Sequence, residues 1–138
     1  MCNWVIAMES IIISLSILIS FQCFSQTPRE VVQLQLDAYN KGDIEAFLEV
    51  FTEDAEAYNY GDTEPFIKGK ANFKTTYRKL FQSSPNLDSL VASRQVLGQT
   101  VIDYEYITGR SNSGKPVLII AIYKIENHKI IRCDFIRE

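Results

Sequence analysis

The fold is decided by residues 27–51, which read TPREVVQLQLDAYNKGDIEAFLEVF. Thr27 and Glu30 stand at the spacing of a capping box, and Pro28 fits the first position of a helix. Apolar residues then recur three or four positions apart, as on the buried face of a helix. Gly42 can adopt the left-handed conformation that ends a helix. The stretch therefore predicts a first helix that ends at Gly42.

The rest of the chain predicts two more helices and then a sheet. Asp43 can cap a second helix, whose apolar stripe reaches Phe51, and a third helix is expected between Gly69 and Ser83. Strands are expected at residues 55–60, 66–68, 87–97, 100–108, 116–125 and 129–136. The last four are joined by short turns, so we expect an antiparallel sheet. Helices followed by a meander of strands predict the α+β class.

Composition excludes several kinds of protein. The 138 residues are 46% hydrophobic and carry a net charge of −3, so we expect one globular domain and no nucleic-acid partner. The chain has one histidine and three cysteines without a CxxC pair. This predicts no metal site, and we expect no cofactor.

The start of the chain resembles a secretion signal. Residues 11–24 read IIISLSILISFQCF, an apolar run shorter than the roughly 20 residues that a membrane helix needs. Small residues before Gln26 fit cleavage after Ser25. We therefore expect residues 1–25 to be a signal peptide and residues 26–138 to be the exported domain, periplasmic or secreted. The membrane would be a partner only through this leader, during export.

Two alternatives for the leader stay open. An uncleaved anchor could run back to Trp4, although Glu9 inside it would be costly in lipid. Cys23 could instead be lipid-modified, although Gln22 before it is bulky for that signal. Determining the mature N-terminus by mass spectrometry separates the three. Cleavage would leave Cys133 as the single thiol, so no internal disulfide is expected.

One predicted strand suggests assembly. Residues 117–122 read VLIIAI and are apolar at every position, whereas a strand with one wet face alternates. Three helices can cover one side of such a sheet. We therefore expect a homodimer through the other side, with a merely hydrophobic central strand as the alternative.

The segment LDAYNKGD at residues 36–43, followed by FTEDA at 51–55, resembles the opening of the NTF2-like superfamily. The match is to its SnoaL-like and ketosteroid-isomerase-like branches. The stretches VIDYE at 101–105 and AIY at 121–123, together with the ending from Lys129 to Ile136, resemble the same group. The resemblance implies a cone, in which a curved sheet wraps round the first helix and leaves a deep apolar pocket open at one end.

The resemblance does not bring a catalytic set with it. Ketosteroid isomerases use a carboxylate base, and a tyrosine and a protonated aspartate as donors to an oxyanion. Counted along this sequence, the base position falls on Asn59, the phenol position on Gln35 and the donor-carboxylate position near Ala121. None of these side chains can do the corresponding chemistry. A proton-transfer site here would have to be built from other residues.

Five polar or aromatic residues are candidates for ligand contact. Tyr58, Asn59 and Tyr60 end the first expected strand, near the implied pocket opening, where an amide and a phenol could bond a ligand while a ring stacks on it. The alternative is ordinary packing at the rim. Tyr39 and Tyr77 lie on the apolar stripes of the first and third helices, where they either pack in the core or reach the pocket.

Two charged pairs stand on the later strands. Asp103 and Glu105 share one strand face, and so do Arg132 and Asp134. If the pairs face each other inside the cone, Asp103 or Glu105 could be the catalytic base and Arg132 and Asp134 could contact ligand. The alternative is a solvated ladder of ion pairs. Cys133 would point the opposite way and be buried, and His128 would lie exposed in a turn.

Three functions remain open on the sequence alone. The first is a domain that binds a small apolar or amphipathic molecule in its cone. The second is an isomerase, hydratase or cyclase in which Asp103 or Glu105 moves a proton without metal, with Tyr58 or Asn59 as oxyanion donor. The third is a protein-interaction module whose cone is filled by its own side chains.

Overall fold

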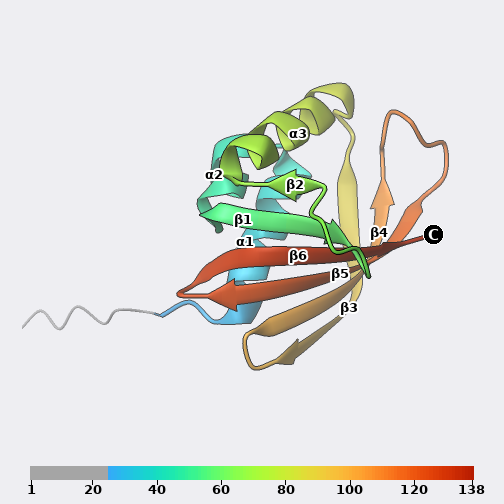
Figure 1. The fold of residues 1–138 in the computed structure, drawn as a ribbon. Coiled ribbons are helices and arrows are strands. Elements are labelled where there is room, and N and C mark those ends of the chain that lie inside the picture. The colour runs from blue at the N-terminus through green and yellow to red at the C-terminus, as the bar shows by residue number, and fades with distance from the viewer. Residues whose placement is uncertain (1–24) are drawn as a thin grey trace, which may run out of the picture.

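The computed structural model describes residues 25–138 (Figure 1). The elements in chain order are α1 (Pro28–Lys41), α2 (Ile44–Glu49), β1 (Phe51–Asn59), β2 (Ile67–Lys68), α3 (Lys70–Ser83), β3 (Asp88–Leu97), β4 (Thr100–Thr108), β5 (Val117–Glu126) and β6 (Lys129–Arg137). The expected leader lies outside the described residues except for Ser25, so its cleavage and the export of the domain stay predictions. Among residues 25–138, none of the helices has the length and apolar character needed to span a bilayer.

The two predicted helix starts are confirmed. The Thr27 hydroxyl accepts a hydrogen bond from the Glu30 amide at 3.3 Å, while the Glu30 carboxylate accepts one from the Thr27 amide at 2.7 Å. Gly42 ends α1 with a φ of 64°, in the left-handed region that favours glycine. The Asp43 carboxylate then accepts from the Ala46 amide at 3.1 Å and begins α2.

The expected extension of α2 to Phe51 is wrong. The helix ends at Glu49, and Phe51 is the first residue of β1, four positions before the expected start of that strand. Phe51 is buried in the core. A buried apolar residue at a boundary fits the stripe of a helix as well as a strand, so the pattern alone could not assign it.

The sheet is mixed. Its strand order is β2-β1-β6-β5-β4-β3, and every neighbouring pair is antiparallel except β1 and β6, where Ala57 stands beside Cys133 in a parallel ladder. The α+β class is therefore confirmed, whereas the expectation of a wholly antiparallel sheet is wrong for this pair. Hairpins fix the directions of β3 to β6, but β1 and β6 are far apart in the chain and no turn sets their relative direction.

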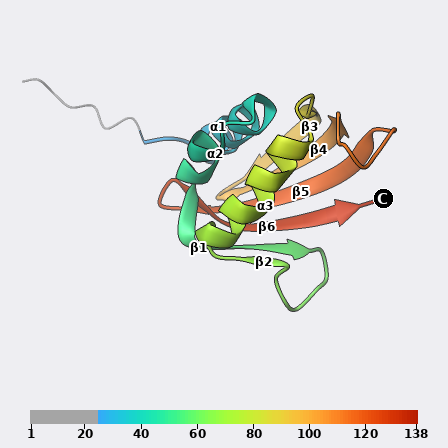
Figure 2. The same ribbon diagram turned by 90° about the horizontal axis from the view of Figure 1, so that it is seen from above.

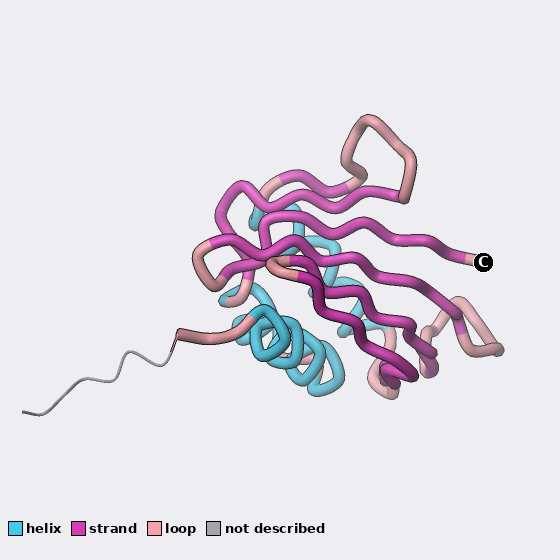
Figure 3. Tube along the Cα trace, turned by 90° about the horizontal axis from the view of Figure 1, so that it is seen from below, coloured by secondary structure: helices cyan, strands magenta, loops and turns pink. Residues whose placement is uncertain are grey.

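All three helices lie over one face of the sheet (Figures 2 and 3). We call this the inner face, and the opposite one the outer face. Residues that alternate along a strand point to opposite faces. On β4 the buried positions are Val101, Asp103, Glu105 and Ile107, so these four side chains point inward.

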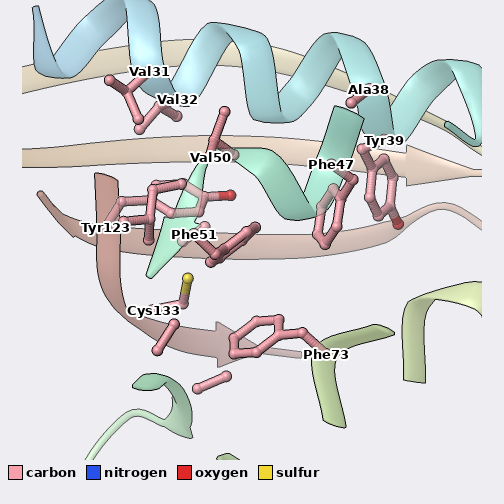
Figure 4. Packing of buried hydrophobic residues seen from close by; sticks show 14 of the residues in the cluster. Val31, Val32, Ala38, Tyr39, Phe47, Val50, Phe51, Phe73, Tyr123 and Cys133 are labelled. Carbon is pink, nitrogen blue, oxygen red and sulfur yellow. The ribbon is translucent and has the colours of Figure 1, made fainter. Parts of the chain in front are cut away.

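Aromatic rings fill much of the space between the helices and the sheet. Their centroids lie 4.4 Å apart for Phe47 and Tyr77, and 4.7 Å apart for Phe51 and Phe73. Tyr39 of α1 joins the cluster with its ring 6.4 Å from that of Phe47 (Figure 4). Aromatic contacts of this kind add to the hydrophobic gain from burial. They also occupy most of the interior that the cone implied.

The outer face carries a row of half-exposed apolar residues. On β5, Ile119 and Ala121 are buried inward, while Leu118, Ile120 and Ile122 point outward. β5, whose residues 117–122 are all apolar, therefore contributes apolar side chains to both faces of the sheet. Neighbours across the ladders extend the row, and they are Ile102, Tyr104, Tyr106 and Ile136. The described helices all lie on the other side of the sheet (Figure 3).

Gly109 marks a close approach of two backbones at the end of β4. Its φ is 75°, and a Cβ at this position would overlap the carbonyl group of Asn86, between α3 and β3. The residue after Arg110 is bound to the same α3–β3 connection, because the Ser111 amide donates to the Ser84 hydroxyl at 3.0 Å. The backbone on both sides of Arg110 is thus held in one place.

Candidate functional site

The candidate site is a small cavity between α1, α3 and the inner face of the sheet. Its volume is about 40 Å³, and it is lined by Gln35, Leu36, Tyr39, Tyr77, Glu105, Ile107, Arg110, Ile119, Tyr123, Phe135 and Arg137. Other hollows are larger, from about 170 to 660 Å³, and the two of about 660 and 590 Å³ are open grooves lined mostly by charged and polar side chains. The small cavity is the one in which buried polar groups from several elements converge, so we take it as the site.

Glu105 is the carboxylate in this cavity. Its side chain is buried and accepts hydrogen bonds from the Ser89 hydroxyl at 2.7 Å and from the Tyr123 hydroxyl at 3.2 Å. Burial raises the pKa of Glu105, and the nearby charge of Asp103 adds to the rise, while the two hydroxyl donors oppose it. A carboxyl group whose pKa is shifted toward neutrality can both accept and return a proton.

Tyr39 and Tyr77 reach the cavity from the helices. Burial raises the pKa of Tyr39 to about 12, against the opposing charge of the Arg110 guanidinium, and burial also raises the pKa of Tyr77. Both phenols therefore stay protonated and can act as donors at neutral pH. Among residues 25–138, the buried Tyr39 hydroxyl has no hydrogen-bond partner.

Two arginines line the cavity from the ends of strands. Arg110 follows Gly109, and its buried Nε likewise has no partner within the described part of the chain. Arg137 ends β6, donates to the side-chain oxygen of Asn59, and lies 4.9 Å from the ring centroid of Phe135. Desolvation lowers the pKa of Arg137, and the positive charge of Arg110 lowers it further. Both cations thus line the same cavity, with Arg110 half-buried and Arg137 exposed to solvent.

Asp103 points inward but is not at the cavity. Arg94 of β3 donates two hydrogen bonds of 2.7 Å to it. Both side chains are almost fully buried, with 1% of Asp103 and 7% of Arg94 exposed. Arg94 also donates to the Gln33 side chain of α1 at 2.9 Å. This carboxylate therefore ties the first helix to the sheet, and the structure gives it no access to a ligand.

Arg132 and Asp134 lie on the outer face, so they do not meet Asp103 and Glu105. Cys133 and Phe135, which alternate with them, belong to the core. The Arg132 guanidinium pairs with Asp134 at 2.7 Å and stacks 3.8 Å from the centroid of Tyr58. The predicted burial of Cys133 is confirmed, and burial raises the pKa of its thiol, which makes it a poor nucleophile.

The Tyr58-Asn59-Tyr60 segment does not line the cavity. The Tyr58 hydroxyl donates to Glu56 at 2.6 Å on the outer face, and Tyr60 is 64% exposed. Asn59 contributes indirectly, because it holds Arg137, which does line the cavity. His128 is exposed in the β5–β6 turn, as predicted, and its ring bonds the Gln26 carbonyl oxygen at 2.8 Å.

Sequence reasoning missed Arg110, Tyr123 and Arg137 as cavity residues. The sequence could have indicated Arg137, because residues two apart on a strand share a face and Arg137 follows Cys133 and Phe135 at this spacing. Tyr123 is likewise in phase with Ile119 and Ala121. Arg110 lies beyond the end of β4, where no periodicity applies, so its place depends on the close approach at Gly109.

Comparison with known protein families agrees with this architecture. The family model described as a SnoaL-like domain matches residues 32–133. The chain therefore belongs to the SnoaL-like family, and the NTF2-like resemblance of the sequence is confirmed. None of the curated proteins compared with the chain matches it.

Solved structures share the fold. An uncharacterized cystatin-fold protein from Novosphingobium aromaticivorans is 26% identical with a TM-score of 0.75, over 81% of this chain and 99% of that one. A proposed ketosteroid isomerase from Kribbella flavida is 15% identical with a TM-score of 0.67, over 80% and 77%. A proposed SnoaL-like polyketide cyclase from Jannaschia sp. CCS1 is 16% identical with a TM-score of 0.67, over 80% and 85%. At such low identities the last two show a common fold and nothing about activity.

The different roles of the carboxylates predict different effects on stability. Asp103→Asn leaves Arg94 buried without its counter-charge, so the free energy of unfolding should fall by about 3 kcal/mol. Asp134→Asn is the matched control, because its partner Arg132 is 42% exposed, and the loss should stay under about 1 kcal/mol. Urea unfolding of both variants measures the difference. Equal losses would contradict a structural role specific to Asp103.

The raised pKa of Glu105 predicts how stability changes with pH. Between the ordinary pKa of about 4.5 and the higher pKa in the folded state, the folded protein binds more protons than the unfolded chain. The Glu105 contribution to the free energy of unfolding therefore falls as pH rises through this window. Glu105→Gln removes this loss, so the variant should gain stability relative to wild type from pH 4.5 upward.

Urea unfolding at intervals from pH 4.5 to 7.5 measures this dependence. The same substitution at Glu126, which is exposed at the end of β5, controls for the loss of any glutamate charge. If the two variants differ from wild type in the same way at every pH, the ionisation of Glu105 is not linked to folding.

Proposed function

We propose that this SnoaL-like domain binds a small amphipathic molecule in the cavity beside Glu105. The observation that carries the proposal is convergence: Tyr39 of α1, Glu105 of β4 and Tyr123 of β5 all reach one enclosed space, together with Arg110 and Arg137. Polar side chains from separate elements that meet in a partly apolar cavity are the usual composition of a small-molecule site.

The dimensions limit the ligand. A cavity of about 40 Å³ holds the equivalent of about three or four water molecules, at roughly 10–15 Å³ each. Leu36, Ile107 and Ile119 form an apolar wall, which suits a short hydrocarbon portion. A larger molecule would require the Arg110 and Arg137 side chains to move outward. The aromatic cluster around Phe47 closes the interior behind the cavity.

Proton transfer is the second candidate function, and Glu105 favours it. A base beside a bound ketone needs a raised pKa and a position at the ligand, and Glu105 has both. The Tyr39 hydroxyl can supply the donor to the developing oxyanion. Asp103 is withdrawn from this role by Arg94, so Glu105 alone would be the base. The reaction class would be isomerisation, cyclisation or hydration through an enolate.

One experiment with acetone in D₂O tests both candidates. Acetone is the smallest ketone, and NMR should show its binding as shifts confined to amides of the lining residues. Ile107→Phe, which fills the cavity, should weaken binding by at least about tenfold, a loss of roughly 1.4 kcal/mol. Ile102→Phe on the outer face of the same strand is the control and should bind like wild type.

The same samples report on chemistry through the exchange of acetone hydrogens for deuterium. If Glu105 is a base, wild type should accelerate this exchange, and Glu105→Gln should lose about 100-fold of that acceleration. Binding without faster exchange would leave the domain as a binding module. Shifts outside the cavity only, or none, would contradict the binding proposal and leave the cone as a packed core for protein interaction.

We further propose that two copies associate through their outer faces. Ile120 lies at the centre of the apolar row, between Tyr104 and Ile136 in the ladders. A contiguous apolar patch of this kind on a soluble domain favours a protein contact. In sedimentation velocity the wild type should run as a dimer and Ile120→Glu as a monomer. Leu34→Glu, on the exposed side of α1, is the control and should remain dimeric. A wild-type monomer would contradict the proposal.

A further inference from the structure

We propose that the ligand of this cavity is a monoanion, an organic carboxylate whose oxygens are held by Tyr39, Arg110 and Arg137. This deepens the proposed function and rests on it, since it names the class of molecule that the cavity takes. Three independent features of the cavity carry the inference, namely two unpaired donors, an excess of positive charge and an apolar wall.

The first feature is a pair of buried donors without acceptors. Tyr39 is 6% exposed, and its hydroxyl has no hydrogen-bond acceptor among residues 25–138, although the Arg110 guanidinium lies near enough to oppose the rise of its pKa. The Nε of Arg110 is also buried and has no hydrogen-bond acceptor among the described residues. Buried polar groups in native proteins are nearly always paired, and each exception calls for an explanation. Both groups line one cavity, so one acceptor placed there would satisfy both.

The second feature is charge. The charged side chains that line the cavity are Arg110, Arg137 and Glu105, which leaves one positive charge uncompensated even when Glu105 is ionised. Within the described residues, neither arginine forms an ion pair with an acidic side chain. Both guanidinium groups line the same cavity, so an anion bound there would be attracted by both of them. A single negative charge therefore balances the cavity.

Glu105 does not take that place itself. Each of its carboxylate oxygens already accepts one hydrogen bond, from the Ser89 hydroxyl and from the Tyr123 hydroxyl, and Glu105 forms no ion pair with either arginine among the described residues. The position of Arg137 is also fixed without Glu105, because Asn59 accepts from its guanidinium and the rings of Phe66 and Phe135 flank it. Neither guanidinium is therefore neutralised by Glu105, and an anion from solution can pair with them.

The third feature separates organic from inorganic anions. Leu36, Ile107 and Ile119 line the same small space and offer nothing to a fully hydrated ion. A carboxylate with one or two further carbons can contact the arginines with its oxygens and the apolar wall with its hydrocarbon part. Guanidinium groups also match the two oxygens of a carboxylate better than a spherical ion. Acetate is the smallest probe that carries both parts.

The experiment is an NMR titration of the ¹⁵N-labelled protein with sodium acetate, with acetamide as the neutral molecule of the same shape. Sodium chloride keeps the ionic strength constant and serves as the inorganic anion. Acetate should shift the amides of the lining residues, and acetamide should bind at least about tenfold more weakly. Tyr39→Phe and Arg110→Gln should each weaken acetate by about fivefold or more, as expected for the loss of one charge-assisted bond. Arg132→Gln on the outer face is the control and should bind acetate like wild type.

Each outcome is informative. Equal binding of acetate and acetamide in the cavity overturns the anion inference and leaves the small-molecule proposal standing. Full competition by chloride overturns the choice of an organic ligand. Unchanged acetate affinity in both Tyr39→Phe and Arg110→Gln overturns the assigned contacts. If neither acetate nor acetamide nor acetone shifts any lining residue, the proposed function itself fails. Tyr39→Phe keeps the ring and its aromatic contacts, so loss of folding does not explain a loss of binding there.

Discussion

The attachment of α1 to the edge strand β3 is the constraint on which the rest of the structure depends. The Asn40 side chain donates to the Ser89 carbonyl oxygen at 2.9 Å and accepts from the Ser89 amide at 2.7 Å, in the way a neighbouring strand would. Backbone groups on a sheet edge need such partners. The hydroxyl of the same Ser89 holds Glu105. One residue thus fixes the distance between the helix that carries Tyr39 and the strand that carries the carboxylate.

Asp103 and Glu105 show how two acidic residues on one strand face acquire opposite tasks. A buried arginine compensates the first and makes it part of the fold. The second receives two neutral hydroxyl donors and no buried counter-charge of its own, and burial outweighs these donors, so its pKa rises. The choice between them lies in β3, which brings Arg94 opposite Asp103 and Ser89 near Glu105. The side chains of β3 therefore determine which of the two carboxylates on β4 is paired with an arginine.

Local features of the fold were predictable from sequence, and non-local ones were not. The caps of α1 and α2, the left-handed Gly42 and the hairpins from β3 to β6 follow from short-range signals, and the structure confirms them. The parallel contact of β1 with β6 has no local signal.

The same limit explains the candidate site. Tyr58 was expected near the pocket because it ends a strand, but which face it occupies depends on the register shift between Phe51 and Glu56, which no sequence pattern reveals. Tyr39, Tyr77 and Glu105 were found because helical stripes and strand alternation point them inward.

The contact of Gly109 with the Asn86 backbone fixes the position of the next residue, Arg110, through the backbone alone. Only a hydrogen atom fits there, so the position of the following residue is inherited with the fold, whatever side chain that residue carries. Replacement of Arg110 alone would then remove or reverse one charge in the cavity lining, while the backbone around it keeps its place.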